Sequence, residues 1–327
     1  MSIIVVTGAA GHVGANLVRE LLARGQRVRA LVHDDRRALE GLDVETVPAD
    51  VENLDSLLHA FDGAEQVVHA AGYISISSDE WPRLEAVNVH GTRNVVDACL
   101  RCSVERLIHV SSVETLLEEP FGELVDESRP LVDSQHCSPY ARSKAAGERE
   151  VRKGLARGLD AVILYPSAII GPYDYRLGFP NNGLLAICRG ELWALVDGGF
   201  DWVDVRDVVR GTLEAAVRAP TGGRYILSGH WASLQELAEL AAEINGSRAS
   251  QLVFPMWLAR AGVPFTVAFN RMVGKRPLYT SAALRPLWGN HRLCHARATR
   301  ELGYDPRPLK ETIVETLQWF ERRSRVE

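Results

Sequence analysis

A tyrosine and a lysine stand four residues apart in the stretch Tyr140-Ala-Arg-Ser-Lys144. On a helix this spacing brings the two side chains to the same face. A free phenol has a pKa of about 10, too high for a base at neutral pH, and a nearby ammonium lowers it by favouring the phenolate. Such a pair can pass a proton to or from an alcohol or ketone oxygen while a nicotinamide gives or takes a hydride. We take Tyr140 and Lys144 as candidate catalytic residues. The alternative is a surface pair, because Y-x-x-x-K is common by chance.

Two serines, Ser111 and Ser112, follow an apolar run that reads as a strand at 106–110. A hydroxyl at this strand end could polarise the same substrate oxygen that Tyr140 protonates. The serine pair therefore adds weight to the tyrosine–lysine motif.

Glycines stand at positions 8, 11 and 14, directly after the β-forming run Ile3–Val6 and at the start of a helical repeat. A buried strand that turns on glycines into a helix makes an anion site. The backbone can approach a phosphate there, and the helix N-terminus offers free N–H groups and a partial positive charge. We interpret the turn as the pyrophosphate site of a dinucleotide. The alternative is a glycine-rich turn without a ligand.

Strand and helix signals alternate through the first half of the chain. Strands are expected at 3–7, 27–32, 44–48, 66–70, 106–110 and 161–165, and helices at 12–24, 54–61, 80–101 and 139–157. This alternation predicts an α/β fold, a doubly wound parallel sheet of the Rossmann type with helices on both faces. In such sheets ligands bind at the carboxyl ends of the strands, where the glycine turn and the serine pair both fall.

The second half is less regular and predicts a smaller, mostly C-terminal lobe over the sheet. We expect a dinucleotide-binding domain at 1–170 with 201–228 returning to it, a substrate-binding lobe at 171–200 and 229–310, and a C-terminal helix at 311–327. Helices are expected at 181–189, 207–218, 233–245 and 309–322, and strands at 202–206 and 224–227. Ser233 and Glu236 have the spacing of a capping box.

The bulk composition is that of an ordinary globular protein. The 327 residues are 46% hydrophobic and 24% charged, with a net charge of −5. This balance argues against a nucleic-acid partner, and no apolar run has the length of a transmembrane helix. The five cysteines cannot all pair and no secretory signal precedes the first strand, so we expect free thiols and a cytoplasmic protein. Cys99-x-x-Cys102 lacks a second cysteine pair, so we expect no metal site.

The segment 248–300 is strongly basic. It carries eight arginines and one lysine and has no aspartate or glutamate. A cationic lobe over a cleft would favour an anionic substrate. The alternative is a solvated basic surface.

Six motifs occur in order along the chain: TGAAGHVG at 7–14, HAAG at 69–72, HVSS at 109–112, YARSK at 140–144, PSAIIGP at 166–172 and DWVDVRDV at 201–208. Together they resemble the extended short-chain dehydrogenase/reductases, the epimerase/dehydratase group, over essentially the whole chain. RALVH at 29–33, NVHGTRNVVDA at 88–98 and ELGYDPRPLKE at 301–311 are most similar to dihydroflavonol-reductase-like and hopanoid-associated sugar-epimerase-like members.

The resemblance implies a role for each matching residue. Tyr140 would be the acid/base, Lys144 would lower its pKa and bind the ribose, and Ser112 would orient the substrate oxygen. Asn88 would match the family's structural asparagine. The cofactor would be bound by Thr7, Gly8, Gly11, His12, Val13, Gly14, His33, Arg36, Arg37, Asp50, Val51, Ala70, Ala71, Gly72, Ser111, Tyr140, Lys144, Pro166 and Ser167.

The residues after the second strand bear on the choice of dinucleotide. An acidic side chain there bonds the ribose hydroxyls of NAD, and a basic one favours the extra phosphate of NADP. The sequence reads His33-Asp34-Asp35-Arg36-Arg37. His33 stands where reductase relatives have arginine and NAD-using epimerases have aspartate. Because Arg36 and Arg37 could reach a phosphate, we favour NADP, and NAD is the alternative.

Departures from the family pattern bear on the substrate. Sugar-nucleotide enzymes of the group carry an arginine just before the Trp/Tyr-Val strand, and here the residue is Asp201. Glu114 matches a catalytic carboxylate of the dehydratases, but Val113 replaces the aspartate of that pair. We expect the substrate to contact Tyr73, Ser112, Glu114, Tyr173, Phe179, Asn181 and Trp193, although the aromatic residues among them could serve packing alone.

The favoured function is an NAD(P)-dependent oxidoreductase that acts on a ketone or alcohol of a moderately bulky small molecule, which is expected to be anionic if the basic segment 248–300 covers the cleft. One alternative is a nucleotide-sugar epimerase or dehydratase with tightly bound NAD. Another is a non-catalytic dinucleotide-binding protein, against which Ser112, Tyr140 and Lys144 argue. The resemblance also implies a homodimer built on the helices at 80–101 and 139–157.

Overall fold

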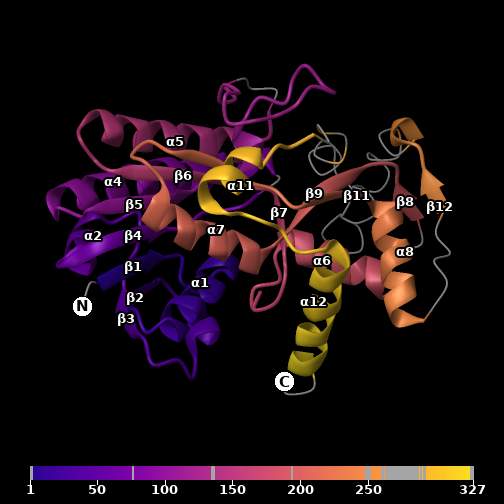
Figure 1. Ribbon diagram of the computed structural model, residues 1–327, viewed down its shortest axis with the longest axis horizontal. Helices are drawn as coiled ribbons and strands as arrows, with labels where there is room; N and C mark the ends of the chain where they lie inside the picture. Colours follow the sequence, from indigo (N-terminus) through magenta and orange to yellow (C-terminus); the bar gives the residue numbers. More distant parts are fainter. Residues whose placement is uncertain are drawn as a thin grey trace.

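The computed structural model describes residues 3–75, 77–133, 137–192, 194–246, 252–258 and 292–324, with the single residues 261, 287 and 289. Its centre is a seven-stranded sheet in the order β10-β6-β5-β4-β1-β2-β3 (Figure 1), in which all neighbouring pairs are parallel. The strands are β1 (Ile3–Thr7), β2 (Arg27–Val32), β3 (Glu45–Pro48), β4 (Ala64–His69), β5 (Arg106–Val110), β6 (Ala161–Pro166) and β10 (Arg224–Leu227). The strand order reverses at β1 and β4, which confirms the predicted doubly wound fold.

Helices cover both faces of this sheet. One face carries α1 (His12–Ala23), α7 (Val205–Arg218) and α11 (Ala296–Leu302), whose apolar side chains pack with the sheet in one buried cluster. The other carries α2 (Leu54–Phe61), α4 (Thr92–Arg101) and α5 (Pro139–Ala156), which form a second cluster. Asn53 caps α2 by accepting the Ser56 N–H, as its sequence position suggests. The short turns are η1 (Arg37–Leu39), η2 (Ser78–Glu80) and η4 (Val113–Thr115).

The predicted helix at 80–101 is not a continuous α-helix. It begins as α3 (Trp81–Leu84), passes through the π-helical turn η3 (Glu85–Gly91) and continues as α4. The π-helical turn packs closely against neighbouring elements at two glycines. A Cβ on Gly91 would lie 2.8 Å from the Val51 side chain, and a Cβ on Gly147 of α5 would lie only 2.1 Å from the Asn88 carbonyl oxygen. Such turns often mark functional sites, and this one contains Asn88.

A smaller lobe lies beside the sheet (Figure 1). It contains the strands β7 (Ala168–Ile170), β9 (Gly199–Asp204) and β11 (His230–Ser233), the pair β8 (Ala194–Val196) and β12 (Leu252–Phe254), and the helices α6 (Phe179–Cys188), α8 (Leu234–Asn245) and α12 (Leu309–Ser324). Their apolar side chains form a third cluster, which includes Leu184, Trp202, Leu237 and Ile313. The predicted capping box of Ser233 and Glu236 is present.

Two expected boundaries in this half are wrong. The strand expected at 202–206 runs from Gly199 to Asp204, and α7 begins at Val205. The reason is that the Asp204 side chain accepts the Arg206 N–H and so caps the helix two residues earlier than its apolar pattern indicates.

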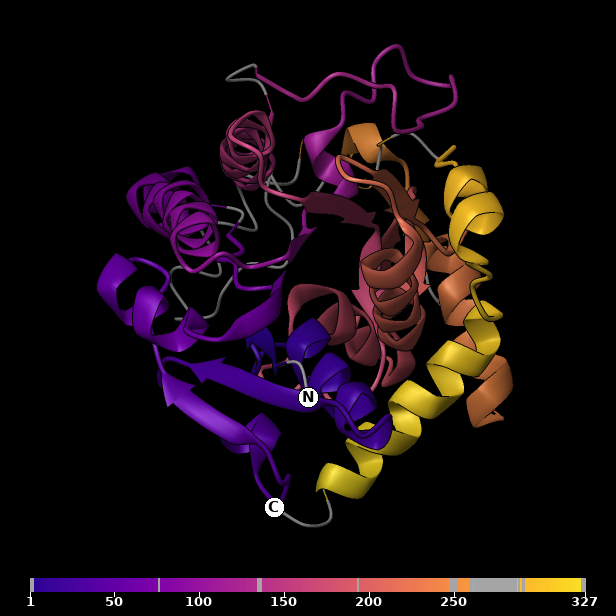
Figure 2. The same cartoon turned by 60° about the vertical axis from the view of Figure 1, so that its left-hand side comes forward.

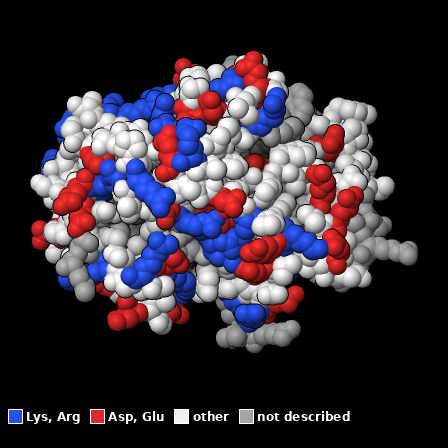
Figure 3. Space-filling model, viewed as in Figure 1, with Lys and Arg blue, Asp and Glu red and all other residues white. Residues whose placement is uncertain are grey.

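The expectation of a cationic lobe, drawn from the basic segment 248–300, concerns residues that the structure describes only in part. Most of that segment lies outside the described residues. On the face seen in Figure 3, acidic side chains gather over α8, which carries Glu236, Glu239 and Glu243. In the described part of the chain, no helix combines the length and the apolar character needed to cross a membrane.

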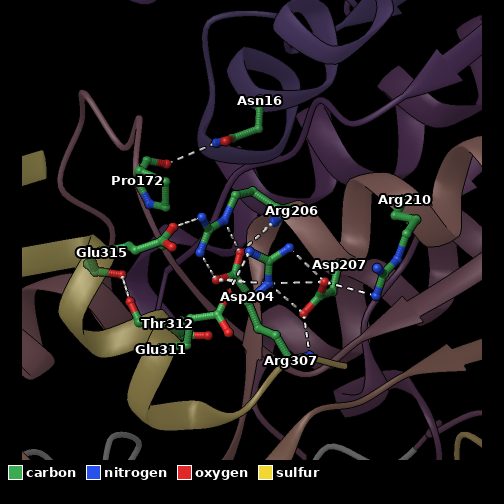
Figure 4. A network of polar contacts seen from close by, with 12 residues as sticks. Asn16, Pro172, Asp204, Arg206, Asp207, Arg210, Arg307, Glu311, Thr312 and Glu315 are labelled. Atoms are coloured by element: carbon green, nitrogen blue, oxygen red, sulfur yellow. Dashed lines mark hydrogen bonds and ion pairs between the residues drawn. The ribbon is translucent and has the colours of Figure 1, made fainter. Parts of the chain in front are cut away.

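A network of charged side chains joins the lobe to the sheet where β9 meets α7 (Figure 4). The carboxylates of Asp204 and Asp207 are fully buried. Arg307 donates to both oxygens of Asp207 at 3.0 to 3.2 Å and lies 3.6 Å from Asp204. Arg206 pairs with Asp204 and also with Glu315 of α12. The network therefore anchors the C-terminal segment against the cofactor half.

We expect Arg307→Met to lower the free energy of unfolding by about 2–4 kcal/mol, because two buried carboxylates lose a shared cation. Arg206 and Arg210 still pair with them, which limits the loss. Chemical denaturation measures the effect. The control is Arg300→Met, since Arg300 is 69% exposed and pairs only at the surface with Glu301. Equal stability of the two variants would contradict a stabilising contribution from the buried network.

Candidate active site

The glycine turn between β1 and α1 is tightly closed. Gly8 has a φ of 67°, and a Cβ on it would lie 2.6 Å from the Ala71 nitrogen. A Cβ on Gly14 would lie 2.2 Å from the Gly8 carbonyl oxygen. Helix α1 has no side-chain cap at Gly11 and no acidic residue in its first turn. Its first N–H groups, from His12 onward, are thus left to an anion, and the turn fits the pyrophosphate of a dinucleotide.

A hydrogen-bonded chain links this turn to Asn88. The Ala71 N–H donates to the Thr7 hydroxyl at 3.2 Å, and Thr7 lies 2.8 Å from His69 Nδ1. His69 Nε2 lies 3.1 Å from the Thr92 hydroxyl, which donates to the Asn88 carbonyl oxygen at 2.7 Å. Burial, and then Lys144, lower the pKa of His69 to about 3, so the ring is neutral with its proton on Nε2. Thr7 therefore has a bridging role between strands, which its prediction as a cofactor ligand did not include.

Asn88 holds the loop at Tyr73 and links it to helix α5. Its side-chain oxygen accepts the Tyr73 N–H at 2.8 Å, and its amide donates to the Tyr73 carbonyl and to Ser143 Oγ, each at 2.9 Å. Lys144 Nζ donates to the Val110 carbonyl oxygen at 2.7 Å, and a Cβ on Gly72 would lie 3.9 Å from that nitrogen. Lys144 thus lies beside the loop 70–72, where the cofactor ribose was expected.

The other catalytic candidates meet at the N-terminus of α5. The Tyr140 and Ser112 hydroxyls are neighbours, close enough for Ser112 to affect the pKa of the phenol. Ser112 Oγ also accepts the Glu114 N–H at 3.2 Å. Ser138 caps α5 and donates its hydroxyl to the Glu114 carboxylate at 3.1 Å. Ser112 and Tyr140 therefore lie beside the Glu114 carboxyl group, and Ser138, the N-cap of α5, holds that carboxyl group in place.

The electrostatics of this cluster differ from the expected lowering of the tyrosine pKa. Burial, and then the Glu114 charge, raise the pKa of Tyr140, and the Ser112 hydroxyl opposes them. Burial lowers the pKa of Lys144 to about 8, although the Glu148 charge opposes it. The lysine charge is directed at a backbone carbonyl, and the phenol is protonated at neutral pH. In this state Tyr140 is a proton donor, as the reduction of a ketone requires.

Glu114 supplies a pH-dependent contribution to stability. Burial raises its pKa from an ordinary 4.5 to about 7. Between these values the folded protein keeps a proton that the unfolded chain has released, so stability falls as pH rises through this window. We expect Glu114→Gln to remove about 2–3 kcal/mol of the decline between about pH 5 and pH 8, measured by denaturant unfolding. The control is Glu123→Gln, because Glu123 is 63% exposed. If the stability of the parent and of Glu114→Gln fell equally with rising pH, the raised pKa of Glu114 would be contradicted.

Ser111 faces away from the cofactor side. Its hydroxyl donates to Glu148 Oε2 at 3.0 Å, and Tyr165 donates to Glu148 Oε1 at 2.7 Å. Glu148 is fully buried and also pairs with Arg152. The prediction of Ser111 as a cofactor ligand does not fit this geometry, because successive residues at a strand end point to opposite sides.

The adenosine end is defined by the residues after β2 and β3. His33 lies 2.6 Å from Asp34 and 3.3 Å from Asp50. Arg37 is bound to Asp35, while Arg36 is exposed. The carbonyl oxygen of Val51 accepts the Asn94 amide at 2.9 Å, which fixes the backbone beside Asp50.

The nicotinamide end was expected at Pro166 and Ser167, where β6 ends. Ser167 is buried beside Asp201, whose carboxylate accepts the Gly229 N–H at 2.7 Å. Burial raises the pKa of Asp201 despite the nearby Ser167 and Gly229. Ala168 follows and belongs to the wall of an apolar cavity of about 90 Å³. Phe179, Leu192, Phe200, Trp202 and Leu234 also line this cavity.

The expected substrate residues do not all gather at one place. Phe179 lines the apolar cavity, and the Tyr73 hydroxyl donates to Glu80 at 3.2 Å. Tyr173 packs instead between Arg19, 4.4 Å from its ring centre, and Trp319 of α12. The Asn181 amide is used by the loop before it: it bonds Gly171 twice and Asp174 once, which explains its burial without a substrate. Trp193 lies outside the described residues.

Sequence reasoning missed Ser138 and Arg176. Ser138 precedes Pro139, a combination typical of a helix start, and that signal could have identified it as the cap that reaches Glu114. Arg176 pairs with Asp35 across 141 residues, and no local pattern predicts such a contact. Among the described residues no group of three His, Cys, Asp or Glu side chains is arranged to hold a metal ion.

Comparisons with known proteins agree with this geometry. A family model described as "NAD dependent epimerase/dehydratase family" matches residues 4–227. The chain is 33% identical to sterol demethylase protein B of Methylococcus capsulatus, over 98% of this chain and 99% of that protein. It is 32% identical to a dihydroflavonol 4-reductase-like protein of Synechocystis, over 98% and 95%. The crystal structure of gox2253 superposes with a TM-score of 0.87 at 30% identity, over 99% of both chains.

The matched region spans the glycine turn, the Ser112–Tyr140–Lys144 cluster and the strands that hold them, and the two relatives extend the likeness to almost the full length. The chain therefore belongs to the NAD dependent epimerase/dehydratase family of enzymes, within the extended short-chain dehydrogenase/reductases that its six ordered motifs resemble.

Proposed function

We propose that this protein is an oxidoreductase that uses NADP(H) to interconvert a ketone and a secondary alcohol on a bulky, largely apolar substrate. The observation that carries the proposal is the grouping of the Tyr140 hydroxyl with Ser112 and Glu114, with Lys144 beside the loop 70–72. A dinucleotide-binding protein without catalysis needs no such proton donor.

The residues divide the reaction between them. Bound NADPH supplies the hydride. Ser112 and Tyr140 hold the substrate oxygen, and Tyr140 passes its proton to that oxygen as negative charge develops there. Burial, and then the Glu114 charge, raise the pKa of Tyr140, so its hydroxyl holds the proton until the substrate oxygen takes it. Lys144 would hold the cofactor ribose, and its positive charge would offset part of the negative charge left on the Tyr140 oxygen after proton transfer.

The apolar cavity supports an apolar group on the substrate, although at about 90 Å³ it has room for only part of a bulky molecule. Its wall is formed by aromatic and aliphatic side chains and begins at Ala168, next to Ser167. Apolar walls favour ring or hydrocarbon bodies over phosphates. The sterol and flavonoid words in the relatives' names agree with such a body. Asp201 in place of the diphosphate-clamping arginine argues in the same direction.

The preference for NADP rests on Arg36 and Arg37 after β2. The test is calorimetric binding of NADP⁺ and NAD⁺ to the purified protein, followed by NADPH oxidation with steroid ketones, dihydroflavonols and UDP-sugars. We expect tighter NADP⁺ binding and turnover of the apolar ketones. Equal or tighter NAD⁺ binding would overturn the cofactor preference, and the absence of NADPH consumption with every ketone would overturn the reaction.

Glu114 supports a second candidate, a nucleotide-sugar epimerase or dehydratase, because it lies next to Ser112 and Tyr140 where dehydratases carry a carboxylate. Dinucleotide that stays bound through purification, with conversion of a UDP-sugar and no net redox change, would favour it.

We also propose a homodimer built on α4 and α5. Within one chain, the ion pairs of Arg93 with Glu150 and of Arg157, just after α5, with Asp97 hold these helices side by side, so that they can present one surface to a second copy. Sedimentation at equilibrium should give twice the chain mass of 36.1 kDa.

A further inference from the structure

A loop from the smaller lobe lies across the glycine turn. We call Pro172–Gly178 the strap. Its first carbonyl oxygen, on Pro172, accepts a hydrogen bond from the Asn16 amide at 2.9 Å (Figure 4). His12 Nε2 lies 3.1 Å from the same oxygen, and both residues belong to α1. The strap therefore starts directly above the proposed pyrophosphate site.

Further contacts hold the strap along α1. The Tyr175 ring packs with a cluster of three alanines, Ala10, Ala15 and Ala38. Arg19 donates to its hydroxyl at 3.2 Å, and Arg323 of α12 donates to its carbonyl oxygen at 3.3 Å. Figure 2 shows α12 running past α1 along the edge of the molecule. The course of the strap toward the turn after β2 is thus fixed by packing on both sides.

The next residue, Arg176, reaches the adenosine end. Its Nε lies 3.5 Å from Asp35 Oδ2. The same carboxylate accepts two bonds from the Arg37 guanidinium, from Nε at 3.0 Å and from Nη2 at 2.8 Å. Asp35 is therefore paired with two guanidinium groups, that of Arg37 from the cofactor half and that of Arg176 from the strap.

These guanidinium groups are suited to a phosphate. Arginine binds phosphate in a planar, two-pronged arrangement, and both side chains are more than half exposed. Asp35 follows β2, where the side chains that distinguish NAD from NADP are found in such folds. A phosphate monoester carries about two negative charges against one for a carboxylate, so it can displace the carboxylate from the arginines.

We propose that Arg176 and Arg37 bind the 2′-phosphate of NADP(H) and that Asp35 is a built-in competitor for the same two cations. The strap then makes cofactor selection depend on a residue of the substrate lobe. Arg37 lowers the pKa of Asp35 to about 2, so the carboxylate competes at every working pH. This inference rests on the proposed dinucleotide site but not on the reaction or on which cofactor the parent prefers.

The test is the ratio of the dissociation constants of NAD⁺ and NADP⁺, measured by calorimetry on the full chain without substrate. We expect Asp35→Asn to raise the ratio about tenfold, because it removes the competing carboxylate charge from both arginines. We expect Arg176→Gln to lower it about tenfold, because one charge-assisted bond to the phosphate is lost. The control is Arg24→Gln, since Arg24 is an exposed partner of Glu20 on α1. Its ratio should equal that of the parent.

The outcomes separate the inference from the function. Loss of affinity for both cofactors alike in Arg176→Gln would show a purely structural strap and overturn the inference. An unchanged ratio in Asp35→Asn or in Arg176→Gln would do the same. A parent that prefers NAD⁺, but whose ratio shifts as expected in both variants, would overturn the proposed cofactor and leave the inference standing.

Discussion

Tyr140→Phe is expected to reduce turnover of an identified ketone at least a hundredfold, since a positioned general acid contributes about 10²–10⁴-fold. The substitution removes the hydroxyl that neighbours Ser112 and keeps the ring. The Glu114 N–H still orients Ser112. Steady-state kinetics with NADPH at saturating concentration gives the rate, and calorimetry gives the NADP⁺ affinity, which separates a loss of proton transfer from a loss of cofactor binding.

A second tyrosine provides the matched control. Tyr225 on β10 donates its hydroxyl to Glu301 at 2.8 Å, so Tyr225→Phe also removes one hydroxyl bond from a buried ring. Its turnover should stay within about twofold of the parent, because no reacting group contacts this end of the sheet. Comparable rates for Tyr140→Phe and Tyr225→Phe would remove Tyr140 from the mechanism.

Gly14→Ala is expected to weaken binding of both NADP⁺ and NAD⁺ at least tenfold. The added Cβ would lie 2.2 Å from the Gly8 carbonyl oxygen and 2.7 Å from the Ala9 Cα, so the turn must open. The N–H groups that face the pyrophosphate then lose their alignment. Backbone displacement in a packed region also costs about 1–3 kcal/mol of stability, which thermal unfolding measures.

Gly25→Ala separates lost stability from lost binding. Gly25 follows the same helix with a φ of 70°, and a Cβ there would meet nothing within 4 Å. The left-handed backbone still makes alanine unfavourable by about 1–2 kcal/mol. We expect a similar loss of stability with unchanged cofactor affinity. Equal loss of affinity in the two variants would mean that general destabilisation, and not the turn, controls binding.

The fold was largely predictable because its signals are local. The elements at 3–7, 27–32, 54–61, 106–110 and 224–227 were predicted with the bounds that the structure has. Each is a short apolar run with a clear period and a turn signal at its end. The π-helical turn at Glu85–Gly91 was not predictable, since it depends on how Gly91 and Gly147 pack against other elements.

The site was predictable where motif residues share an element, and less so where distant segments meet. Tyr140 and Lys144 share a helix, but the roles of the adjacent serines depend on side-chain direction: Ser112 faces Tyr140, and Ser111 faces Glu148. Glu114 raises the pKa of Tyr140 only because the fold brings the two groups together away from water, and no sequence pattern predicts that arrangement. Tyr173 and Asn181 stand in the expected loop, yet packing and loop closure already use them.

Hydride transfer itself tests the central claim most directly. NADPH carrying deuterium at the transferable position of the dihydronicotinamide is incubated with the protein and an apolar ketone, and the products are examined by mass spectrometry and NMR. The proposed function predicts one deuterium on the new carbinol carbon, one NADP⁺ formed for each alcohol, and transfer at least a hundredfold slower in Tyr140→Phe. Turnover without net NADPH oxidation, with the deuterium retained on bound cofactor, would contradict it and indicate an epimerase or dehydratase.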